Sequence, residues 1–177
     1  MNKLTALRSR LSAVPILMLL GLSACASADV VSINAASQDQ IHSIKVSEIN
    51  VVLETPKPNE LLQTALKNNL EEAMPLCATG RVDHRLDVTV TDFDEQNVGK
   101  AIFIGDEIEL QGRAEFTDLA TGTQTGAYFI ENSFFWGGLI GAAMMSDAEL
   151  SLSEGFTENL CKEVFDVDLV QLKKTQN

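Results

Sequence analysis

Three cysteines are the residues of this 177-residue chain whose type and position most clearly suggest chemistry. A thiol can take a lipid, join a disulfide or act as a nucleophile. Cys25 ends an apolar stretch, residues 11–24, that follows the positively charged Lys3, Arg8 and Arg10. The stretch is shorter than the roughly 20 residues that a membrane-spanning helix needs. The pattern therefore predicts a secretory signal peptide that is removed from the mature protein.

The four residues at the predicted cleavage site, Leu22-Ser23-Ala24-Cys25, resemble the lipobox of bacterial lipoproteins. This resemblance implies cleavage before Cys25, a thioether-linked diacylglyceryl group on its sulfur, and a protein anchored to a membrane and facing the periplasm. Two or more acyl chains give stable anchoring. Ala26 follows the cysteine, and the same resemblance then favours the outer membrane over the inner one. The alternative is an ordinary signal peptide in which Cys25 occurs by chance.

Cys77 and Cys161 are the two cysteines that remain if Cys25 carries lipid. Cysteines left over in an oxidising compartment tend to pair. We therefore predict a disulfide between them, with two buried free thiols as the alternative. Neither belongs to a Cys-x-x-Cys pair, so thiol exchange has little support as a function.

Residues suited to catalysis or metal binding are few. The two histidines, His42 and His84, are expected to be surface or locally bonded residues, because no nucleophile-elbow pattern accompanies them. The acidic run from Asp92 to Glu95 lacks the glycine and the glutamate that a calcium loop requires further along. We expect no enzymatic activity, no metal and no cofactor, and a hydrolase is the less favoured alternative.

The charge balance limits the partners of the protein. Removal of residues 1–24 takes away three basic residues and no acidic ones, so the formal net charge changes from −12 to −15. Such a field repels nucleic acid and anionic lipid surfaces. Solubility is the simplest explanation of the acidity. The more specific explanation is that the acidic domain attracts a basic partner.

Hydrophobic periodicity predicts the fold class. Alternating apolar residues indicate strands over 44–53, 86–91, 107–116 and 123–132. Leucines and other apolar residues at every fourth position indicate helices over 60–74 and 152–164, the first capped by Asn59 and ended by Pro75. We expect an α+β domain in the order strand, helix, three strands, helix, with a mostly antiparallel sheet of about four strands and two helices on one face.

The chain divides into four predicted regions. They are a signal peptide over 1–24, a flexible tether over 25–40, a single α+β domain over 41–168 and a C-terminal tail over 169–177. The tether is expected because its small and polar residues show no sustained period.

An uncharged segment with three glycines, Phe134 to Met145, is the most unusual part of the predicted mature chain. Twelve residues are too few to span a bilayer, so the segment is either a buried connector or a contact surface for a partner or lipid. The candidate contact residues are Phe134, Phe135, Trp136, Leu139 and Ile140.

The tract from Gly105 to Gly112, with the turn residues Asp118 and Thr121-Gly122, gives residues 41–166 a resemblance to small envelope lipoproteins of undefined function. Some of these are similar in layout to auxiliary lipoproteins of transport systems. The resemblance implies a non-catalytic, protein-binding accessory of a cell-envelope assembly. The alternative is a carrier or sensor of an apolar ligand, such as a lipid, held between helices and sheet.

Overall fold

Five strands form one mixed sheet in the computed structural model, which describes residues 26–57, 59–94, 106–136 and 147–175. The strands are β1 (Ala26–Asn34), β2 (Ile44–Leu53), β3 (Val82–Asp94), β4 (Asp106–Asp118) and β5 (Gln124–Trp136). Their order across the sheet is β1-β5-β4-β3-β2. Neighbouring strands are antiparallel except for β2 and β3, which run parallel.

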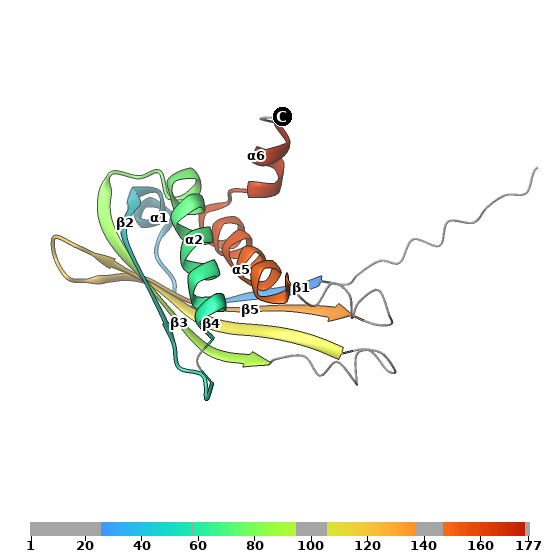
Figure 1. Ribbon diagram of the computed structural model, residues 1–177. Coiled ribbons are helices and arrows are strands. Elements are labelled where there is room, and N and C mark those ends of the chain that lie inside the picture. The colour runs from blue at the N-terminus through green and yellow to red at the C-terminus, as the bar shows by residue number, and fades with distance from the viewer. Residues whose placement is uncertain (1–25, 58, 95–105, 137–146, 176–177) are drawn as a thin grey trace, which may run out of the picture.

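Two long helices, α2 (Glu60–Cys77) and α5 (Ala148–Phe165), lie side by side on one face of the sheet (Figure 1). The chain passes through α2 between β2 and β3, and a parallel strand pair requires such a crossover. Two short helices complete the described part: α1 (Gln38–Ser43) precedes β2, and α6 (Leu169–Thr175) follows α5. The predicted α+β class with both main helices on one face is confirmed.

The start of α2 follows directly from its sequence. The Asn59 side chain accepts a hydrogen bond from the Leu62 amide at 2.9 Å, which is the predicted N-cap. Leu62, Leu66 and Leu70 are fully buried against the sheet. The predicted end at Pro75 is wrong, because the helix continues through this proline to Cys77.

The sheet has one buried and one uncovered face. Alternate residues of β3, β4 and β5 point toward the helices α2 and α5. Leu86, Phe116 and Ile130 are fully buried on this face of the sheet. Phe156 of α5 packs over Gly112 of β4, where an added Cβ would lie 3.1 Å from the ring. Side chains thus fill the interface between helices and sheet, and no described residue favours a ligand bound in it. None of the described helices covers the other face (Figure 1).

Two sequence-based boundaries and one expectation about the sheet are corrected by the structure. The predicted tether is wrong for Ala26–Asn34, which pairs with β5 as a fifth strand. The predicted tail is wrong for Leu169–Thr175, which forms α6 with Leu169 buried. The sheet is also more mixed than expected, since the edge strand β2 pairs in parallel with β3.

Candidate protein-binding groove

The predicted contact residues lie at one end of the sheet. Phe134 is half-buried against the core, and the backbones of Phe135 and Trp136 finish β5. Leu139 and Ile140 lie outside the described residues, as does the predicted lipidation site Cys25. In the β1–β5 pair Ala26 is opposite Phe134, so the chain emerges from Cys25 beside the first predicted contact residue.

The predicted disulfide is present. Cys77, the last residue of α2, is bonded to Cys161 in α5, with 5.6 Å between their Cα atoms. Both side chains are buried in the core. The bridge fixes α2 against α5, so the surface between these two helices has a defined shape.

His84 has a structural role in the sheet. Its side chain is buried, Nδ1 lies 2.7 Å from the Val82 carbonyl oxygen and Nε2 lies 2.9 Å from the Thr125 hydroxyl. The locally bonded alternative is therefore correct for His84 and the surface alternative is wrong. The other histidine, His42, lies exposed on α1. Within the described ranges, no three His, Cys, Asp or Glu side chains gather in a way that could bind a metal ion.

A groove of about 230 Å³ lies between α2, α5 and α6 on the outer surface of the helices. Sequence analysis did not predict it. Its walls combine apolar and acidic side chains from all three helices, namely Asn69, Glu72, Ala73, Leu76, Leu150, Glu154, Thr157, Glu158, Leu169 and Lys173. The groove is smaller than the roughly 300–1,000 Å³ that small-molecule sites commonly enclose.

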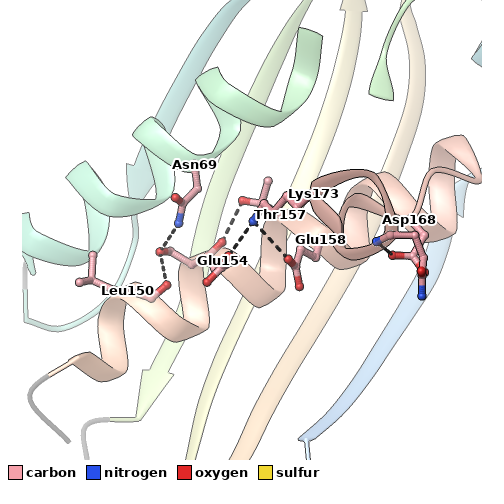
Figure 2. A network of polar contacts seen from close by, with 9 residues as sticks. Asn69, Leu150, Glu154, Thr157, Glu158, Asp168 and Lys173 are labelled. Carbon is pink, nitrogen blue, oxygen red and sulfur yellow. Dashed lines mark hydrogen bonds and ion pairs between the residues drawn. The ribbon is translucent and has the colours of Figure 1, made fainter. Parts of the chain in front are cut away.

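Lys173 of α6 reaches across this groove, as Figure 2 shows. Its Nζ donates a hydrogen bond to Glu154 Oε1 at 2.8 Å and forms an ion pair with Glu158 Oε1 at 3.6 Å. The hydrogen bond to Glu154 raises the pKa of Lys173. Burial raises the pKa of Glu158, the neighbouring Glu154 raises it further, and Lys173 opposes both effects.

A polar network under the groove links α2 to α5 through one hydrogen bond and continues along α5 (Figure 2). Asn69 of α2 donates to the Ser153 hydroxyl at 2.8 Å, and Ser153 donates to the Leu150 carbonyl at 2.8 Å. Thr157 donates to the Ser153 carbonyl, also at 2.8 Å. Because Ser153 and Thr157 are buried, these bonds satisfy groups that would otherwise destabilise the interface.

The Glu158 carboxyl in the groove is expected to affect how the free energy of unfolding depends on pH. Because the folded-state pKa of Glu158 is raised, Glu158 stabilises the fold most below its ordinary pKa of 4.5, and that contribution is lost as the pH rises through the folded-state value. Glu158→Gln, which stays neutral, is expected to gain stability relative to the unsubstituted protein with rising pH. The gain should stay below about 1 kcal/mol, since solvent screens this half-buried group.

Urea unfolding between about pH 4 and pH 8 measures this difference. Glu163→Gln, an exposed carboxylate on the same helix outside the groove, is the matched control. Identical pH profiles for the two variants would contradict the effect of burial at Glu158.

Comparisons with known proteins find only partial structural likeness at low identity. No protein-family model matches the chain, and no curated protein matches it. Among solved structures, the PelC dodecamer from Paraburkholderia phytofirmans is 12% identical with a TM-score of 0.45, over 77% of this chain and 98% of that one. A candidate lipoprotein from Caulobacter crescentus is 10% identical with a TM-score of 0.45, over 72% and 92%. Protein XCC0632 from Xanthomonas campestris is 8% identical with a TM-score of 0.38, over 75% and 90%.

At these identities and TM-scores the likeness transfers no residue, partner or function to this chain. None of the described helices is long and apolar enough to cross a membrane.

Proposed function

We propose that the protein is a lipid-anchored accessory lipoprotein of the cell envelope, which faces the periplasm and binds other proteins without catalysing a reaction. The outer membrane is the favoured location. The observation that supports the proposal most directly is the pairing of Ala26 with Phe134, because it brings the proposed lipid attachment and the aromatic end of β5 to one end of the sheet.

Anchoring at Cys25 would keep this end of the sheet at the bilayer surface. β1 begins at Ala26, directly after the proposed lipidated residue, and Phe134, Phe135 and Trp136 lie on the neighbouring strand. Aromatic residues suit the membrane–water interface, where an apolar ring meets a polar surrounding. This part of β5 is therefore our proposed contact with lipid or with a partner at the membrane.

The described side chains support a binding role over a catalytic one. Both ring nitrogens of the buried His84 have partners within the sheet. Glu154 and Glu158 of the groove pair with Lys173. Charge and apolar surface are thus arranged for recognition of another molecule.

Replacing Cys25 by serine tests the anchor. We expect Cys25→Ser to abolish incorporation of labelled palmitate and to move the protein from the membrane fraction to the soluble fraction, because each buried acyl methylene contributes about 0.8 kcal/mol to membrane binding. Ala24→Gly, which keeps a small residue before the cysteine, should behave like the unsubstituted protein. Equal labelling of the Cys25→Ser protein would exclude the lipid anchor.

Photo-crosslinking in living cells tests the binding role. A crosslinkable residue is placed at Phe129 on the uncovered face, Trp136 at the sheet end or Leu150 in the groove, with Thr121 in the β4–β5 turn as the control. We expect at least one of the three positions to crosslink to a protein in a Cys25-dependent manner. Crosslinking no stronger than that from Thr121 at all three positions would remove the support for protein binding.

A further inference from the structure

The walls of the groove have the spacing of a helix-binding surface. Leu150, Glu154 and Glu158 follow one another at four-residue intervals along one face of α5. From Leu150 to Glu158 this wall extends about 12 Å, at about 1.5 Å per residue. Such a length matches roughly two turns of a bound helix.

Exposed leucines lie on both sides of the groove. Leu150 of α5 is 48% exposed and Leu76 of α2 is 47% exposed. Between them the floor is apolar and closed, because Ala73 and Leu169 are buried. An amphipathic segment could place apolar side chains against these leucines.

The charge of the groove is negative. Glu72, Glu154 and Glu158 contribute three carboxylates to the lining, and Lys173 is the one ammonium group among the lining residues described above. Burial and the proximity of Glu154 raise the pKa of Glu158, and Lys173 opposes both effects. A cationic side chain from outside would balance the excess.

Lys173 already shows how such a side chain binds. It reaches the two glutamates from α6, a seven-residue helix of which only Leu169 is buried. The remaining residues of α6, Val170 to Thr175, are exposed. The chain's own C-terminal helix therefore presents a basic residue to the groove through a small contact.

We propose that the groove between α2, α5 and α6 binds a basic amphipathic segment of a partner protein. A lysine or arginine of that segment takes the position of Lys173 between Glu154 and Glu158, and its apolar side chains pack on Leu76 and Leu150. The inference deepens the proposed function, on which it rests, by assigning a surface and a chemistry to the protein partner. Because Lys173 and the incoming cation share one site, the Lys173 side chain competes with the partner while α6 stays in place.

Fluorescence anisotropy with labelled peptides of about twelve residues tests the proposal. The protein is used as the chain beginning at Ala26, which contains every described strand and helix. A peptide with leucine and lysine at helical spacing should bind. Lys173→Ala should tighten its binding by about threefold or more, because the competing cation is removed. Glu154→Gln combined with Glu158→Gln should weaken it by about tenfold or more.

Control variants carry the same change in charge at positions outside the groove. They distinguish binding of the peptide in the groove from its general electrostatic attraction to an acidic protein. Lys67→Ala and the double variant Glu71→Gln with Glu163→Gln alter exposed residues outside the groove lining and should leave binding unchanged. Equal weakening by the two double variants would overturn the proposal. Equal binding of a peptide with glutamate in place of lysine would overturn it as well, since the groove would then select apolar surface alone.

Circular dichroism confirms that each variant is folded before its affinity is compared. A failed peptide test together with Cys25-dependent crosslinks from Phe129 or Trp136 would remove the groove as the contact and leave the proposed function in place. Crosslinks absent from all three positions would count against the function itself.

Discussion

Replacing both Cys77 and Cys161 by alanine is expected to lower the free energy of unfolding by about 4.5 kcal/mol, the chain-entropy value for a bridge between residues 84 positions apart. The closed loop contains the three central strands β3, β4 and β5. Without the bridge, the unfolded chain regains the freedom to separate the ends of this loop. A loss of this size is a large part of the roughly 5–15 kcal/mol that typical domains possess.

Urea unfolding of oxidised protein, with and without the double substitution, measures the effect. A reducing agent should destabilise the unsubstituted protein and leave the stability of the double variant unchanged. The double variant is therefore the control for effects of the reducing agent other than loss of the bridge. Coincident unfolding curves for the two oxidised proteins would mean that the bridge contributes nothing to stability.

Phe156→Ala is expected to destabilise the protein by about 3–5 kcal/mol, the usual cost of removing a fully buried aromatic ring. The ring packs directly over Gly112 of β4, so the helix α5 approaches the sheet closely here. Its removal leaves a cavity between helix and strand that neither neighbour can fill. Phe129→Ala, on the uncovered face and half-buried, is the matched control and should cost less.

The contact with Gly112 gives a second measure of the same packing. An added Cβ at Gly112 would lie 3.1 Å from the Phe156 ring and 3.1 Å from the Thr89 carbonyl oxygen. In a double-mutant cycle, Gly112→Ala and Phe156→Leu should therefore couple, with an interaction energy of about 0.5–3 kcal/mol. Strictly additive effects on the urea midpoint would show that the two positions do not share this space.

Local patterns were sufficient for the elements whose burial is regular. The leucines of α2 recur every fourth residue and Asn59 caps the helix, and the alternation along β4 matches its burial. In the sequence, Ile44 and Val46 are out of phase by one position with Ile49, Val51 and Leu53, and β2 has an irregularity between Val46 and Glu48. Counting cysteines was enough to predict the Cys77–Cys161 pair.

The missed elements depend on partners that are distant in the sequence. The apolar residues of β1, Val30, Val31 and Ile33, do not alternate regularly, and β1 is a strand because it pairs with β5 about a hundred residues later. α6 has a single buried residue, Leu169, and its pattern alone is indistinguishable from that of a tail. The groove needs α6 in place over α2 and α5, so no local pattern could have predicted it.

The absence of a spacer before β1 has a consequence for the distance over which the domain can act. With lipid on Cys25, the strand β1 would begin at the membrane. No flexible tether would then let the domain move away from the bilayer. The neighbouring strands β4 and β5 are each 13 residues long, which corresponds to about 44 Å. The turn at Asp118 to Thr123 lies at the far end of this rigid hairpin. Under the proposed anchoring, the length of the sheet would limit the height above the bilayer at which the protein could meet a partner.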